Sequence, residues 1–122
     1  MNSPATILVV EDDVQLQNTY QDRLSQEGFK VVASDSVSTG LNQIKSLRPN
    51  LVVLDIMLPG GQNGFDFLEQ IKLDSELKDT PVLVITNLDH QRDIALSIGA
   101  IDCLLKTDVD LETVVSKIKS YL

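Results

Sequence analysis

The sequence has little of several residue types on which other protein classes depend. Cys103 is the single cysteine in 122 residues, so no disulfide can form within the chain. Its apolar neighbours Ile101, Leu104 and Leu105 predict a buried, unreactive thiol. His90 is the single histidine and lies in a polar stretch without companion metal ligands, which predicts a solvated surface residue. A chain of this length buries roughly two-thirds of its unfolded surface, so it can fold without disulfides or a structural metal.

Long apolar runs and basic residues are also scarce. No apolar run approaches the roughly 20 residues that a membrane-spanning helix requires. The first residues, MNSPATILVVEDD, lack the basic flank and cleavage site of a signal peptide, so we expect a cytoplasmic protein without a membrane partner. Ten Lys and Arg against eighteen Asp and Glu give a net charge of −8. That charge repels phosphates, and no basic cluster offsets it, so we expect no direct DNA binding.

Apolar segments of two kinds alternate along the chain. Short continuous runs predict strands buried on both faces, and runs with helical spacing predict amphipathic helices. Gly28 and Gly99 stand where two helices should end, and Ser36 is a plausible N-cap. We expect strands at 6–10, 29–33, 51–55, 82–86 and 101–105, and helices at 14–26, 37–47, 65–73, 89–98 and 110–122.

This alternation of five strands with five helices predicts the fold class. Strands joined through helices by short connections form a parallel sheet with right-handed crossovers and helices on both faces. The sequence contains no linker, repeat or low-complexity tract, so we expect residues 1–122 to form a single α/β domain.

Polar residues gather at the predicted carboxyl ends of the strands. Glu11 and Asp12 follow the first strand, Asp55 ends the third, Thr86 ends the fourth and Lys106 follows the fifth. Taken alone, Asp55 is as well explained as a cap of the next turn. Together these residues share one rim of a parallel sheet, where α/β proteins bind ligands. Neighbouring carboxylates with a phosphate oxygen suit Mg²⁺, and a carboxylate such as Asp55 can act as the nucleophile in phosphoryl transfer.

The segments VVEDD, LVVLDIMLPGG, VLVIT and LLK occur in the order and at the spacing typical of one family. Over its whole length the chain resembles the response-regulator receiver domains of two-component signalling. The resemblance implies a flavodoxin-like, doubly wound fold with strand order 2-1-3-4-5. It also implies a signalling domain rather than an enzyme, one that promotes only its own phosphorylation and dephosphorylation.

The resemblance further implies a role for each residue of the rim. Asp12 and Asp55 would bind Mg²⁺ directly, Glu11 would act through water, and Met57 would offer its backbone carbonyl. Asp55 would take a phosphoryl group from a sensor histidine kinase or a phosphotransfer protein. Lys106 would pair with that group, and the Thr86 hydroxyl would move to bond it. The signal would then reach an unidentified protein target through the face formed by the fourth helix, fifth strand and fifth helix. A homodimer joined by salt bridges of Arg92 and Asp102 is left open.

The sequence departs from the family pattern at four places. Thr107 replaces the usual proline after Lys106, so we expect a trans peptide bond and a rearranged loop. Asn87 replaces a small residue after Thr86, and Cys103 replaces an aromatic residue. The loop from Asp55 to Gly64 is one residue longer than usual.

Two other functions follow from these departures and from the fold. A receiver-like module that binds a partner without being phosphorylated is the main alternative. A magnesium-dependent phosphatase is disfavoured, because Met57 stands where such an enzyme needs a second carboxylate. Met57 and Leu88 border the route of an attacking water and cannot orient it, which predicts a long-lived phosphoryl group.

Overall fold

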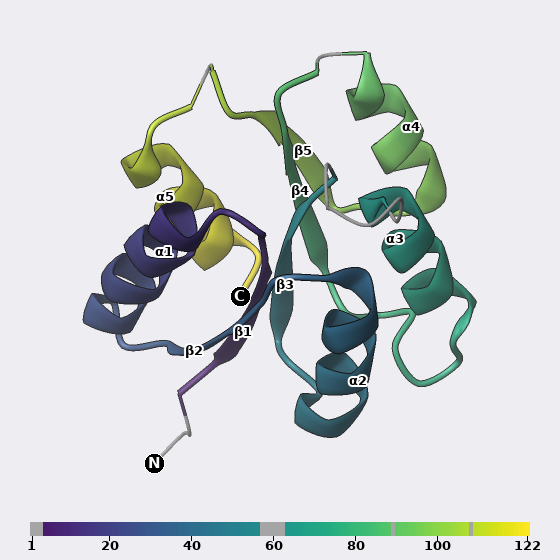
Figure 1. The fold of residues 1–122 in the computed structure, drawn as a ribbon, viewed down its shortest axis with the longest axis horizontal. Helices are drawn as coiled ribbons and strands as arrows, with labels where there is room; N and C mark the ends of the chain where they lie inside the picture. The colour runs from purple at the N-terminus through teal and green to yellow at the C-terminus, as the bar shows by residue number, and fades with distance from the viewer. Residues whose placement is uncertain (1–3, 57–62, 89, 108) are drawn as a thin grey trace.

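The computed structural model describes residues 4–56, 63–88, 90–107 and 109–122, and it has five strands and five helices in strict alternation (Figure 1). No helix in these ranges is long and apolar enough to span a membrane. The elements in chain order are β1 (Thr6–Val10), α1 (Val14–Gln26), β2 (Lys30–Ser34), α2 (Val37–Leu47), β3 (Leu51–Asp55), α3 (Gly64–Leu73), β4 (Val82–Thr86), α4 (Gln91–Ile98), β5 (Asp102–Leu105) and α5 (Leu111–Ser120).

The strands form one parallel sheet in the order β2-β1-β3-β4-β5, which confirms the predicted fold class. β3 lies at the centre, and all five of its residues are buried. This explains why its sequence, LVVLD, shows no polar alternation, since each face of the strand packs against a helical layer.

Helices cover both faces of the sheet. In Figure 1, α1 and α5 lie on one side, and α2, α3 and α4 lie on the other. Side chains alternate along a strand, so odd and even residues of the same strand belong to different cores. Ile7, Val53 and Ile85 pack with the α1 and α5 side chains, whereas Val10, Leu54 and Val84 pack with those of α2 and α3.

Two of the helix ends are formed by the residues predicted for them, Ser36 and Gly28, and a third is capped by Asp13. Asp13 caps α1 by accepting a hydrogen bond from the Leu16 amide at 3.1 Å, and Ser36 caps α2 by accepting one from the Thr39 amide at 3.3 Å. Gly28 follows α1 with a φ of +93°, a conformation that a glycine adopts without strain.

Several details of the sequence prediction differ from the structure. The fourth helix is Gln91–Ile98 rather than 89–98, the fifth strand is Asp102–Leu105 rather than 101–105, and the fifth helix is Leu111–Ser120 rather than 110–122. Phe29 was expected to open the second strand, but its amide donates to the Leu24 carbonyl and so closes the end of α1; β2 begins at Lys30. The apolar spacing of the fourth helix predicts that Ile94, Ala95 and Ile98 face inward; Ala95 is buried and Ile98 packs against the core, but Ile94 is 46% exposed. In a helix of eight residues, a short apolar stripe leaves the buried face poorly defined.

Candidate functional site

The strand ends bring three charged side chains together on one face of the sheet. Side chains alternate along β3, so Asp55 points to the same face as Leu51 and Val53, whose side chains lie in the core beneath α1 and α5. Glu11 follows β1, and its amide donates to the Ser34 carbonyl at 2.9 Å. Lys106 follows β5, and its amide donates to the Thr86 carbonyl at 2.8 Å. These backbone bonds extend the strand pairing by one residue and fix where both side chains start.

Lys106 joins the two buried carboxylates. Its Nζ lies 3.0 Å from Asp55 Oδ2 and 3.3 Å from Glu11 Oε1. Glu11 is 3% exposed and Asp55 is 6% exposed, so both carboxyl groups are largely removed from water. Burying an ionised carboxylate is costly, and the ammonium group offsets part of that cost.

Asp12 completes an acidic cluster at the solvent side. Glu11, Asp12 and Asp55 each offer a carboxylate oxygen, and these oxygens lie within 4.8 Å of one another. Asp12 is exposed, whereas the Oε2 atom of Glu11 is buried and has no hydrogen-bond partner among the described residues. A buried carboxylate oxygen without a donor, next to two further carboxylates, fits a hard cation that prefers oxygen ligands, such as Mg²⁺.

The electrostatics of the cluster shift two pKa values. Burial, and next the proximity of Asp55, raise the pKa of Glu11 to about 8, although Lys106 opposes this effect. Burial alone would lower the pKa of Lys106, but Asp55 and Glu11 together raise it above its usual value. Lys106 therefore stays charged at neutral pH, and without a cation Glu11 is largely protonated.

Thr86 ends β4 at the same rim but is directed differently. Along β4, Thr86 points to the same face as Val82 and Val84, which is the face that α4 covers. The Thr86 hydroxyl donates to Gln91 Oε1 at 2.6 Å and accepts from the Leu88 amide at 3.2 Å. The sequence predicted that Thr86 would lie at the rim, but it gave no sign of the partner Gln91, which lies in a polar stretch without a pattern.

The departures from the family pattern have different structural settings. Asn87 and Thr107 are exposed, and Cys103 is buried at 1% exposure, as expected for an unreactive thiol. No cis peptide bond occurs in the described ranges, so the Lys106–Thr107 bond is trans as predicted. Met57 and most of the loop that follows Asp55 lie outside the described residues.

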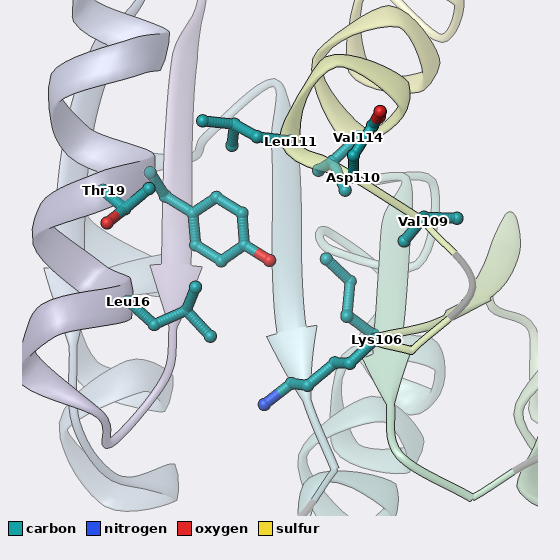
Figure 2. A pocket seen from close by; sticks show the side chains of 9 residues that line it. Leu16, Thr19, Lys106, Val109, Asp110, Leu111 and Val114 are labelled. Atoms are coloured by element: carbon teal, nitrogen blue, oxygen red, sulfur yellow. The ribbon is translucent and has the colours of Figure 1, made fainter.

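A pocket of about 160 Å³ lies beside Lys106, between α1 and α5. Figure 2 shows Leu16 and Thr19 on α1 across from Leu111 and Val114 on α5, with Lys106 at the edge. The lining is mostly apolar and includes Lys106, whose ammonium group reaches the carboxylates. Tyr20 lines the same pocket, and burial raises the pKa of its phenol to about 12. In the sequence, Tyr20 showed only a helical apolar spacing.

Asp102 and Arg92 interact within the chain. The Asp102 carboxylate lies 3.7 Å from Arg92 and 3.6 Å from Lys117, and it accepts a hydrogen bond from the Tyr121 hydroxyl at 2.9 Å. The same carboxylate accepts the Cys103 amide at 2.8 Å. This network ties α4, β5 and α5 to one another.

Solved structures of other proteins share this fold. A CheY-like response regulator receiver domain protein of Methanospirillum hungatei superposes with a TM-score of 0.87 at 26% identity, over 97% of this chain and 93% of that one. The chemotaxis response regulator CheY4 of Vibrio cholerae gives a TM-score of 0.89 at 22% identity, over 98% and 99%.

Sequence relatives are longer proteins. The phosphate regulon transcriptional regulatory protein PhoB of Escherichia coli is 34% identical over 118 residues, which are 95% of this chain and 51% of PhoB. The DNA-binding response regulator MtrA of Mycolicibacterium smegmatis is 36% identical over 102 residues, which are 82% and 43% of the two chains. The chain thus spans about half the length of the curated relatives it matches.

These relatives correct the prediction that excluded direct DNA binding. MtrA is named a DNA-binding response regulator and PhoB a transcriptional regulatory protein, so the exclusion is wrong as a rule for proteins of this kind. The net charge of −8 describes only the repulsion between these 122 residues and phosphates. It carries no information about the half of each relative that lies outside the aligned region.

The family model of the response regulator receiver domain matches residues 7–119. This range includes all five strands except Thr6, the first residue of β1. The fold, the strand order and the acidic cluster agree with that match. The chain therefore belongs to the response regulator receiver domain family of two-component signalling systems.

Proposed function

We propose that this domain receives a phosphoryl group on Asp55 from a histidine kinase or a phosphotransfer protein, with Mg²⁺ held at the acidic cluster. Asp12 and Asp55 would bind the ion directly and Glu11 through water, with the Met57 carbonyl as a further ligand. Bound Mg²⁺ would neutralise negative charge on the phosphoryl oxygens.

The observation that carries this proposal is the contact of Lys106 with both Asp55 and Glu11. A nucleophilic carboxylate must approach an anionic phosphoryl group, and the two repel each other. The ammonium group, 3.0 Å from Asp55, supplies a positive charge at that point, and the hydrogen bond from the Lys106 amide to the Thr86 carbonyl fixes where its side chain starts.

The proposed transfer forms one bond and breaks one bond. An Asp55 carboxylate oxygen bonds to phosphorus while the bond between phosphorus and the donor breaks, which leaves imidazole from phosphohistidine or acetate from acetyl phosphate. Lys106 then pairs with the phosphoryl oxygens instead of the free carboxylate. The Thr86 hydroxyl donates to another of these oxygens, which links the site to the face formed by α4, β5 and α5.

Mass spectrometry of the protein after treatment with acetyl phosphate and Mg²⁺ tests this proposal. We expect a gain of one phosphoryl group that hydroxylamine removes, as for an acyl phosphate, and that Asp55→Asn abolishes. Asp13→Asn is the matched control, because it removes a neighbouring carboxylate but keeps a residue able to cap α1. A folded protein that binds Mg²⁺ but gains no phosphoryl group would instead support the binding module that is not phosphorylated.

The lifetime of the phosphoryl group is a further part of the proposal. Leu88 is 37% exposed and carries no group that can orient an attacking water. We expect slow hydrolysis on this basis, and a half-life of only seconds with Mg²⁺ present would contradict it.

A further inference from the structure

The buried Thr86 hydroxyl is hydrogen-bonded to Gln91, the first residue of α4. Thr86 is fully buried, so its hydroxyl depends on protein partners for hydrogen bonds. It has two, Gln91 Oε1 at 2.6 Å and the Leu88 amide at 3.2 Å, and both belong to the segment that enters α4. Gln91 is the first residue of α4, and its half-buried side chain turns back toward the end of β4.

We propose that Gln91 is a positioning residue that holds the Thr86 hydroxyl away from Asp55 until a phosphoryl group is present. The inference rests on the proposed function of Asp55 and Thr86. A hydroxyl has one O–H donor, so Thr86 cannot donate to Gln91 and to a phosphoryl oxygen at the same time. The two side chains also point to opposite faces of the sheet, Asp55 to the face of α1 and α5 and Thr86 to the face of α4. Binding of Thr86 to the phosphoryl group therefore requires release from Gln91.

Gln91 is also adjacent in the chain to a residue that contacts β5, on the face formed by α4, β5 and α5. The next residue, Arg92, donates to the Cys103 carbonyl at 3.2 Å and pairs with Asp102 at 3.7 Å. Loss of the Thr86 bond removes a hydrogen bond between β4 and the first residue of α4, one residue before these contacts to β5. The bond to Gln91 thus favours the unphosphorylated arrangement at both the site and α4.

The test measures how tightly the Mg²⁺-loaded protein binds beryllium trifluoride, an analogue of the phosphoryl group, by calorimetry and by the ¹⁹F signal of the adduct. Gln91→Met keeps the length of the side chain and removes the acceptor. Loss of one buried hydrogen bond to the free state should tighten binding about two- to tenfold. Gln91→Glu keeps an acceptor oxygen, and we expect it to bind no more tightly than the wild type. Gln91→Ala repeats the test if the methionine variant folds poorly.

Thr86→Val provides the control background. Without the hydroxyl there is nothing for Gln91 to hold, so Gln91→Met should not change the affinity of a Thr86→Val protein. The inference is overturned if Gln91→Met fails to tighten binding in the wild type, or if it tightens binding equally in the valine background. If the wild-type protein binds no beryllium trifluoride, or if Asp55→Asn binds it equally well, the proposed function fails and the inference fails with it.

Discussion

The Lys106 ammonium group lies 3.0 Å from the Asp55 carboxylate although β4 separates the strands that carry the two residues. The contact is possible because β4 ends with the Thr86 side chain on the opposite face of the sheet. The space above the end of β4 is left to Lys106, which crosses it along the wall that includes Ile85. The direction of the Thr86 side chain and the pairing of Lys106 with Asp55 therefore both follow from the alternation of side chains between the two faces of a strand.

Replacing Lys106 with Met should destabilise the domain more at high pH than at low pH. Without the ammonium group, Glu11 and Asp55 face each other uncompensated once Glu11 is ionised. We expect a loss of about 1–3 kcal/mol in the free energy of unfolding at pH 9, and a smaller loss at pH 6, where Glu11 is protonated. Urea denaturation with a chelator present measures both values, with Lys45→Met as the surface control. Equal losses at the two pH values would contradict this explanation.

Glu11 should make the metal-free domain less stable as pH rises. The pKa of Glu11 is raised from 4.5 to about 8 in the folded protein. Its contribution to the free energy of unfolding is therefore fully present below pH 4.5 and is lost as pH rises to about 8. The loss is at most about 5 kcal/mol, since one pKa unit corresponds to about 1.4 kcal/mol. Glu11→Gln should flatten the pH dependence of unfolding between these limits. Added Mg²⁺ should restore stability at pH 8 in the wild type, with release of protons that calorimetry in two buffers detects.

Removing the Tyr121 hydroxyl should weaken the network around Asp102. Burial alone would raise the pKa of Asp102, but the hydrogen bonds from Tyr121 and Cys103 and the charges of Lys117 and Arg92 hold it below its usual value. Tyr121→Phe should therefore cost about 1 kcal/mol at neutral pH. Because the folded pKa is depressed, this contribution is present above about pH 4 and disappears as pH falls through the folded value. A cost that stays constant down to pH 2 would show that packing of the ring, and not the hydrogen bond, is responsible.

Gly64→Ala should disturb the site from outside the charged cluster. A Cβ atom at this position would lie 2.8 Å from the Asp55 carbonyl oxygen and 2.8 Å from the Ile56 Cα. Both contacts are with backbone, so either α3 or the end of β3 has to move, and we expect a loss of about 2 kcal/mol in stability. Gln70→Ala, at an exposed position of the same helix, should change stability by less than about 0.5 kcal/mol. The urea midpoints of the two variants check this, and similar values would contradict the proposed close approach.

The sequence by itself determined the alternation of strands and helices and the rim on which the polar residues meet. Continuous apolar runs such as Leu51 to Leu54 and caps such as Ser36 are local signals, because they are visible in a short stretch of the chain. Parallel strands joined through helices place their carboxyl ends together, so Glu11, Asp55 and Lys106 could be assigned to one rim without coordinates.

Only the tertiary structure decided which of these residues touch and in which protonation state. The register between strands, and the face to which the last side chain of each strand points, bring Lys106 to Asp55 and Glu11. The same two factors bring Thr86 to Gln91. The raised pKa of Glu11 depends first on its burial and then on Asp55, which lies on β3. Such effects depend on distances between residues far apart in the sequence, and the apolar pattern of a single segment contains no information about those distances.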